Sequence, residues 1–209
     1  MSKRPPPGRA ITGQPAAGAA VQPAGKTGEV RIIAGTWKRS RLRVLSRPGL
    51  RPTPDRVRET LFNWLGADLS GWRVLDAFAG SGALGLEAAS RGAAEVVLLD
   101  NDPQTVRELA FSHQRLNAPP SVRVECADAM AWMARCPAAR FELIFLDPPF
   151  GAGLTDRAVA QALRLLVPSA WLVIESPQPL PPPDAGLEIR KQLRAGAVYL
   201  ELRQLVPPG

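Results

Sequence analysis

A regular alternation of short apolar runs and helical segments is the feature that most constrains the fold of this chain. Five such runs lie between residues 74 and 175, and the run at 141–147 is almost wholly apolar. Strands that are buried on both faces of a parallel sheet have this composition. Two further runs, 188–193 and 198–205, predict an antiparallel hairpin. We therefore predict an α/β fold with an open, doubly wound, seven-stranded, mostly parallel sheet that binds ligands at the carboxyl ends of its strands.

The N-terminal third of the chain does not follow this pattern. Residues 1–28 contain five Gly and five Pro and almost no large apolar side chains, which predicts a flexible tail. Residues 29–70 predict a small extension of two short strands and a helix. That helix is expected to begin at Thr53-Pro54-Asp55, with the Thr53 hydroxyl as its N-cap, and to end at Gly66. Residues 71–209 form the predicted α/β domain.

The net charge of +7 comes entirely from the first third of the chain. Residues 1–28 carry +4, residues 29–72 carry +5, and residues 73–209 carry −2. A basic segment beside a nearly neutral body is typical of a module that binds a polyanion. The charge alone is equally compatible with a solvated tail and surface.

A glycine-rich turn, Gly80-Ser81-Gly82-Ala83-Leu84-Gly85, follows the first strand of the α/β region. Asp100 lies 20 residues beyond Gly80, where a carboxylate can accept both hydroxyls of an adenosine ribose. This match alone would indicate a nicotinamide dinucleotide enzyme. Asp76 comes just before the turn and would repel a pyrophosphate, whereas it would attract a ligand that carries an ammonium and a sulfonium.

The strand at 141–147 ends in Asp147-Pro148-Pro149-Phe150. With this motif, the chain resembles the class I S-adenosylmethionine-dependent methyltransferases that modify exocyclic amino groups of bases. The resemblance implies S-adenosyl-L-methionine as the cofactor, with Asp100 at its ribose and Asp128 at its adenine amino group. The implied cofactor-binding residues are Asp76, Phe78, Gly80, Ser81, Gly82, Asp100 and Asp128.

The four residues of this motif are the candidates for catalysis. An exocyclic amine is a poor nucleophile because its lone pair is delocalised into the ring. Asp147 can accept one N–H and the Pro148 carbonyl the other, which would direct the lone pair at the methyl group. Pro149 stiffens the turn, and Phe150 offers a ring on which the base can stack. Glu175, at the end of the next strand, is compatible both with shaping the base pocket and with a solvated strand end.

Two motifs in the extension narrow the resemblance to one family of methyltransferases. Arg31-Ile32-Ile33-x-Gly35-x-Trp37 and Arg51-Pro52-Thr53-x-Asp55-Arg56-Val57-Arg58-Glu59 are similar to the RsmD family of bacterial 16S ribosomal RNA guanine-N2 methyltransferases. The resemblance covers about residues 29–205. It implies methyl transfer to the 2-amino group of a guanine in 16S rRNA, within the assembling or assembled small ribosomal subunit.

The basic residues of the extension suit an RNA substrate because they can neutralise several phosphates. Arg41 and Arg43 alternate with apolar residues, which places both on the exposed face of a strand. Trp37 is expected to pack beneath the hairpin rather than to stack on a base. The predicted RNA-binding residues are Lys38, Arg39, Arg41, Arg43, Arg51, Arg56 and Arg58.

Other classes of protein find less support in the sequence. No stretch approaches the about 18 apolar residues of a membrane helix, and Cys126 and Cys136 lack partners at zinc-ligand spacing. We expect a cytoplasmic, monomeric enzyme without a metal ion or membrane contact. Three alternatives stay open: an adenine-N6 methyltransferase that acts on DNA or RNA through the Asp147 motif, an NAD-dependent oxidoreductase, and a non-catalytic RNA-binding protein.

Overall fold

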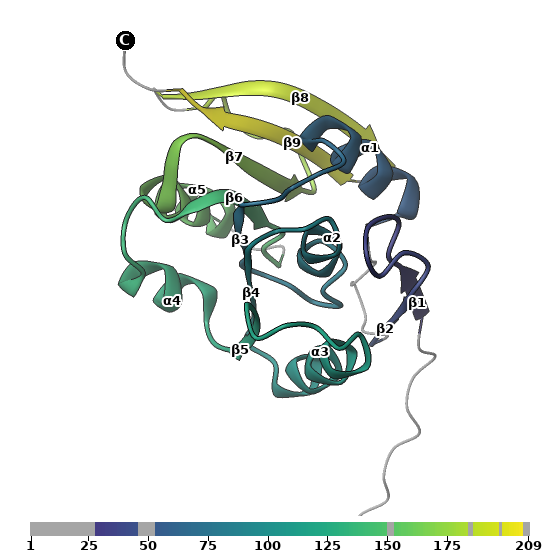
Figure 1. Cartoon of the computed structure of the whole chain (residues 1–209). Helices are drawn as coiled ribbons and strands as arrows, with labels where there is room; N and C mark the ends of the chain where they lie inside the picture. The colour runs from purple at the N-terminus through teal and green to yellow at the C-terminus, as the bar shows by residue number, and fades with distance from the viewer. Residues whose placement is uncertain (1–27, 46–52, 150–152, 184–185, 197, 207–209) are drawn as a thin grey trace, which may run out of the picture.

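The computed structural model describes residues 28–45, 53–149, 153–183, 186–196 and 198–206. The rest of the predicted tail, Arg51 and Phe150 lie outside these ranges. The centre of the molecule is a seven-stranded sheet in the order β5-β4-β3-β6-β7-β9-β8 (Figure 1). Its strands are β3 (Arg73–Asp76), β4 (Glu95–Asp100), β5 (Val122–Cys126), β6 (Phe141–Leu146), β7 (Leu166–Ser176), β8 (Leu187–Ala195) and β9 (Val198–Leu205). The predicted fold class is confirmed.

Strand β3 lies in the middle of the parallel part of the sheet. It pairs in parallel with β4 on one side and with β6 on the other, and the outer pairs β4–β5 and β6–β7 are parallel as well. The hairpin β8–β9 completes the sheet, with β9 antiparallel to β7. The strand order reverses between β3 and β6. In open α/β sheets, ligands bind at the carboxyl ends of the strands that flank such a switch point.

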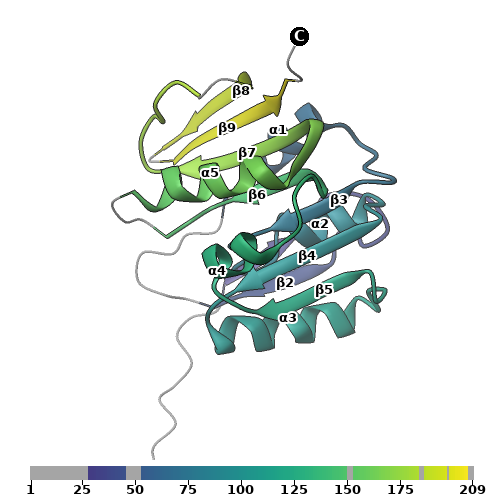
Figure 2. The same cartoon turned by 90° about the vertical axis from the view of Figure 1, so that its left-hand side faces the viewer.

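Helices cover both faces of the sheet (Figure 2). The first cluster of buried side chains joins one face to α1, α2 and α3, and the second joins the other face to α4 and α5. The helices are α1 (Asp55–Leu65), α2 (Gly85–Ser90), α3 (Pro103–Arg115), α4 (Ala129–Arg135) and α5 (Leu154–Leu165). Within the described ranges, no helix is long and apolar enough to cross a membrane.

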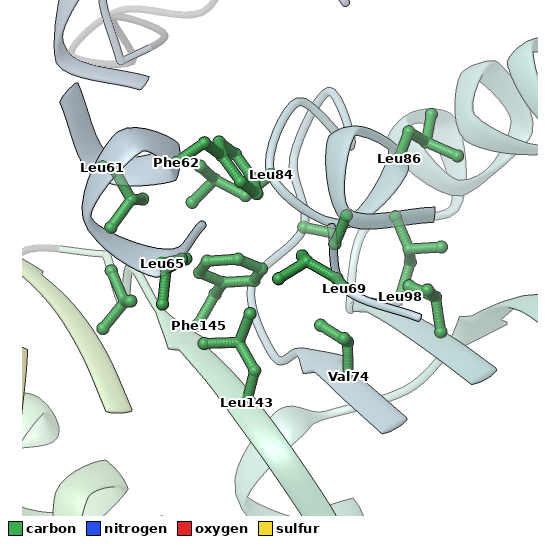
Figure 3. Close-up of a cluster of buried hydrophobic side chains, with 14 of the residues drawn as sticks. Leu61, Phe62, Leu65, Leu69, Val74, Leu84, Leu86, Leu98, Leu143 and Phe145 are labelled. Carbon is green, nitrogen blue, oxygen red and sulfur yellow. The ribbon is translucent and has the colours of Figure 1, made fainter. Parts of the chain in front are cut away.

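Helix α1 of the extension packs directly on the sheet, as Figure 3 shows. Phe62 of α1 and Phe145 of β6 are fully buried, and their ring centroids lie 6.1 Å apart with the planes tilted by 59°. Such an aromatic pair contributes about 0.5–1.5 kcal/mol beyond its buried area. Leu61 and Leu65 fill the space around the two rings. The extension and the α/β domain therefore share one core.

The hairpin of the extension, β1 (Gly28–Arg31) and β2 (Arg41–Val44), is joined to α2 by the loop between its strands. The Glu87 carboxylate accepts hydrogen bonds from the backbone N of Ile33 at 2.6 Å and of Ala34 at 3.0 Å. The Ser90 hydroxyl accepts one from the backbone N of Trp37 at 2.9 Å. Gly35 has a φ of +81°, and a Cβ there would lie 1.8 Å from the Ser90 carbonyl oxygen. Only glycine fits this contact.

Three local expectations can be compared with the structure. Gly66 ends α1 with a φ of +108°, as predicted. Gly28, which the sequence analysis assigned to the tail, is the first residue of β1. The prediction that Thr53 caps α1 is wrong, because the N-cap residue is Pro54, without a side-chain hydrogen bond. The Thr53 hydroxyl instead donates to Glu175 of β7, at 2.7 Å.

Candidate active site

Four carboxylates stand at the carboxyl ends of neighbouring strands, two on each side of the switch point: Asp76, Asp100, Asp147 and Glu175. Side chains alternate along a strand, so each of these residues shares a face with the residue two positions earlier. Those earlier residues all belong to the cluster on the α1–α3 side: Val74, Leu98, Phe145 and Val173. The four carboxylates therefore project on the same side of the sheet edge.

Asp76 is buried at the end of β3. Its Oδ2 accepts a hydrogen bond from the backbone N of Gly85 at 2.9 Å. Burial, together with the charge of Asp100, raises the pKa of Asp76 to about 7, although the Gly85 bond acts in the opposite direction. Among the described residues, no cation lowers this pKa. A carboxylate in this environment is stabilised when a positive charge comes close to it.

Asp147 and Glu175 follow paired positions on adjacent strands, since Leu146 of β6 lies beside Ile174 of β7. Burial, and then the charges of Glu175 and Asp76, raise the pKa of Asp147 well above its ordinary value. Burial also raises the pKa of Glu175, against the opposing effect of the hydrogen bond from Thr53. Desolvated carboxylates with perturbed pKa values are characteristic of functional sites.

The glycine-rich turn lies beside these carboxylates and is tied to β4 by Asp100. The backbone N of Gly80 donates to Asp100 Oδ2 at 3.1 Å, and Oδ1 of the same carboxylate accepts from the backbone N of Asp102 at 2.9 Å. Gly80 has a φ of +52°, and a Cβ there would meet no atom within 4 Å. The backbone of the turn is therefore accessible to a ligand at Gly80.

The other residues predicted to bind the cofactor occupy different environments. Phe78 is half-buried against the cluster on the α4–α5 side, and Ser81 is half-buried in the turn. Gly82 is buried, and a Cβ there would lie 2.6 Å from the Leu109 side chain of α3. Asp128 is exposed at the start of α4, where its Oδ1 accepts from the backbone N of Ala131 at 2.7 Å. Contact of these residues with a cofactor stays a prediction.

The Asp147-Pro148-Pro149 segment leaves the sheet at the switch point. Pro148 is buried and Pro149 is exposed, while the stacking role predicted for Phe150 lies outside the described residues. Within the described residues, no three His, Cys, Asp or Glu side chains are grouped so as to hold a metal ion. The donor set instead fits a cationic organic ligand, because buried carboxylates and an open backbone turn meet there.

The hairpin presents basic side chains on its outer face. Arg41 and Arg43 are both exposed, as predicted, and Arg41 pairs with Glu29 at 2.9 Å. The Arg43 guanidinium carbon lies 5.9 Å from the ring centre of Phe111 of α3, a side chain that is 50% exposed. An exposed ring beside a guanidinium is suited to stacking on an unpaired base. Phe111 was not among the residues predicted from the sequence.

The remaining predicted RNA-binding residues divide into two groups. Lys38, Arg39 and Arg56 are exposed. Arg58 is fully buried, and its Nη2 donates to the Arg31 carbonyl and to Asp55, both at 2.8 Å. A side chain without exposed surface cannot reach a phosphate, so the structure contradicts the prediction for Arg58. Trp37 packs against the first cluster, as expected.

Known proteins similar to this chain cover both the extension and the α/β domain. Residues 30–204 match the family described as conserved hypothetical protein 95. Ribosomal RNA small subunit methyltransferase D of Escherichia coli strain K12 is 39% identical over 191 residues, which span 88% of this chain and 93% of the relative. The protein of the same name from Haemophilus influenzae is 41% identical over 156 residues, 73% of this chain and 78% of the relative. A solved structure from Escherichia coli, described as the candidate methyltransferase yhhF, has a TM-score of 0.76 and 36% identity, and the match covers 86% of this chain and 99% of that one.

Proposed function

We propose a reaction for this chain from one premise: the chain belongs to the conserved hypothetical protein 95 family, the RsmD family that its motifs resemble. It is a methyltransferase with the class I fold. The reaction that we propose is transfer of a methyl group from S-adenosyl-L-methionine to the exocyclic 2-amino group of one guanine in 16S rRNA. The name shared by its relatives supports an rRNA of the small ribosomal subunit as the substrate.

The observation that carries this proposal is the set of desolvated carboxylates at the switch point. S-Adenosylmethionine, when bound, supplies a methyl group on a positively charged sulfur. Asp76 has a pKa raised to about 7, and no cation of the described part of the chain lowers it, so it would attract the positive charges of this ligand. In this proposal Asp100, which is hydrogen-bonded to the backbone N of Gly80, would accept the ribose hydroxyls. The open backbone at Gly80 would lie against the cofactor, and Asp128 would contact the adenine amino group.

Asp147 and Pro148 would prepare the amine for attack. Asp147 accepts one N–H of the 2-amino group and the Pro148 carbonyl accepts the other, which localises the lone pair on nitrogen. These bonds strengthen as positive charge develops on the nitrogen, and therefore they lower the barrier. The raised pKa of Asp147 also suits it to take the proton that the methylated amine releases.

The extension would hold the RNA while the base enters the site. Its exposed cations, including Arg41 and Arg43, would contact phosphates, and Phe111 would stack on an unpaired base. Such contacts suit rRNA within the assembling or assembled small subunit. This substrate implies a cytoplasmic enzyme, and we expect it to act as a monomer.

The proposal is tested by mapping methylated nucleotides in rRNA from a strain that lacks this protein. We expect one N2-methylguanine to disappear from 16S rRNA and to return with the intact gene. Calorimetric titration of the purified protein should show binding of S-adenosylmethionine and none of NADH. An unchanged 16S rRNA, or loss of an N6-methyladenine instead, would overturn the proposed substrate.

A further inference from the structure

The Glu175 side chain has one oxygen that accepts no hydrogen bond from the described residues. Glu175 is only 6% exposed. Its Oε2 accepts the hydrogen bond from Thr53, whereas no described residue donates to Oε1. Oε1 is not one of the buried atoms that lack a partner, so this oxygen keeps some exposed surface. An acceptor held in place by its neighbour oxygen is thus presented to a ligand.

This oxygen lies beside the groups assigned to the amine. Adjacent parallel strands are about 4.8 Å apart, and Asp147 and Glu175 follow paired residues on β6 and β7. Both carboxylates project on the α1–α3 side of the sheet edge. After burial, the charge of Glu175 is the next contribution that raises the pKa of Asp147. Two neighbouring carboxylates are stabilised when hydrogen-bond donors come between them.

The Watson–Crick edge of guanine carries such donors. Its 2-amino group has two hydrogens, and the adjacent ring nitrogen N1 carries a third. Asp147 and the Pro148 carbonyl account for the amino hydrogens, so the N1–H requires one more acceptor. Adenine has an acceptor at N1 and presents no hydrogen there. An anionic oxygen at this position therefore distinguishes the two purines.

We propose that Glu175 Oε1 accepts the N1–H of the target guanine and thereby determines base specificity, and that Thr53 positions Glu175 for this contact. The inference rests on the proposed function. Thr53 belongs to the extension and lies 122 residues before Glu175 in the sequence. The same extension carries the exposed cations of the hairpin, so the part that holds the RNA also sets the geometry of the base pocket.

The test compares two bases at the mapped target position. 2,6-Diaminopurine keeps the 2-amino group but has an acceptor at N1. Small subunits are reconstituted with rRNA that carries either guanine or 2,6-diaminopurine at this position, and kcat/KM for methyl transfer is measured with each. We expect the wild-type protein to prefer guanine by about 10- to 100-fold, the worth of one hydrogen bond to a charged group.

In Glu175→Gln, the amide can donate to N1 of 2,6-diaminopurine, so the preference for guanine should fall below about threefold. Affinity for S-adenosylmethionine should stay within a few-fold of wild type. Glu188→Gln, on the exposed surface of β8, is the matched control and should keep the wild-type preference. An unchanged preference in Glu175→Gln would overturn the inference, as would a loss confined to cofactor affinity.

The positioning role of Thr53 is tested separately, by the pH dependence of kcat/KM. Its hydrogen bond lowers the pKa of Glu175, so Thr53→Val should move the acidic limb of the kcat/KM profile to higher pH. Thr53→Ser should restore the wild-type limb. An unshifted limb in Thr53→Val would remove Thr53 from the inference. If the wild-type protein methylates no guanine at N2, the proposed function fails, which is a different result from an unaltered base preference.

Discussion

Glu87 and Asp147 are both carboxylates within the fold, and their surroundings are opposite. Glu87 in α2 is fully buried and accepts hydrogen bonds from Ile33, Ala34 and the Arg91 Nε, the last at 2.8 Å. The carboxylate of Asp147 has no hydrogen bond within the described residues, and burial, together with neighbouring carboxylates, raises its pKa. A carboxylate that is surrounded by donors holds the architecture together, whereas one without donors marks the place of a ligand.

Asp147→Ala tests the functional side of this contrast and has the largest expected effect. Loss of the acceptor for the amine should lower kcat/KM for methyl transfer by about 10³-fold or more. Affinity for S-adenosylmethionine, measured by calorimetry, should change by less than about threefold. Asp147→Asn keeps one acceptor oxygen and should retain more activity than Asp147→Ala. Near-wild-type turnover of purified Asp147→Ala would contradict the assignment.

Glu87→Gln tests whether the carboxylate that is surrounded by donors stabilises the fold. The change leaves the Arg91 guanidinium without its anion and turns an amide donor toward backbone donors, so it should lower the free energy of unfolding by about 3 kcal/mol. Denaturant titration measures this change. Glu59→Gln on the exposed surface of α1 is the control and should stay within about 0.5 kcal/mol of wild type. Equal stability of Glu87→Gln and Glu59→Gln would mean that the Glu87 contacts contribute little.

Asp76→Asn tests whether a functional carboxylate destabilises the ligand-free protein. The pKa of Asp76 is raised from 3.8 to about 7, so the folded state binds more protons than the unfolded state between these values. The stability of the wild type therefore falls as pH rises from about 4 to 7. The Asn side chain of the variant cannot ionise. The melting temperature of Asp76→Asn should therefore be several degrees above that of the wild type at pH 8, and the two should differ little at pH 4.

The same residue links cofactor binding to pH. A cationic ligand favours ionised Asp76, so the affinity of the wild type for S-adenosylmethionine should rise as pH increases from about 6 to 8. Asp76→Asn should bind the cofactor about tenfold more weakly at pH 8 and show a flatter dependence. If the affinity of Asp76→Asn for S-adenosylmethionine still rose steeply with pH, the titrating group would be another carboxylate.

The exposed cations of the hairpin should show the smallest effect per residue. Replacement of Arg41 and Arg43 by Glu should weaken RNA binding and flatten the plot of log K against log salt, because fewer counterions are released. Phe111→Ala should weaken binding without a change in this slope, since stacking involves no counterion. Filter binding at several salt concentrations measures both. An unchanged slope in the double variant would exclude this surface from phosphate contact.

The order and type of the elements after Trp72 could be predicted from sequence because each strand carries its own local signal. Residues 143–146 are apolar on both faces, and the structure buries them between two helical layers. Asp76 and Asp147 could be placed at the sheet edge because a residue next to the end of a strand keeps that position in any α/β topology. Their elevated pKa values could not be foreseen, since these depend on burial within the folded site and on carboxylates from other strands.

The contacts of the extension were harder to predict because they join distant parts of the chain. Nothing near Thr53 indicates a partner 122 residues away, and the local cap interpretation was the natural one. Arg58 had a usable signal, since it falls on the buried stripe of α1 with Leu61, Phe62 and Leu65. Its charge favoured the surface in our prediction, but Nη2 has partners in Arg31 and Asp55, while Nε and Nη1 are buried without a partner among the described residues.

The close contact between Gly35 and the Ser90 carbonyl limits how the hairpin can be replaced. The loop and α2 meet without room for a methyl group, and Glu87 supplies acceptors for two successive amides of the same loop. A hairpin transplanted from an unrelated enzyme would need to reproduce the backbone path at Gly35 as well as the partners of Glu87. Changes of side chains on the outer surface of the hairpin leave these contacts intact, whereas exchange of the whole hairpin would break them.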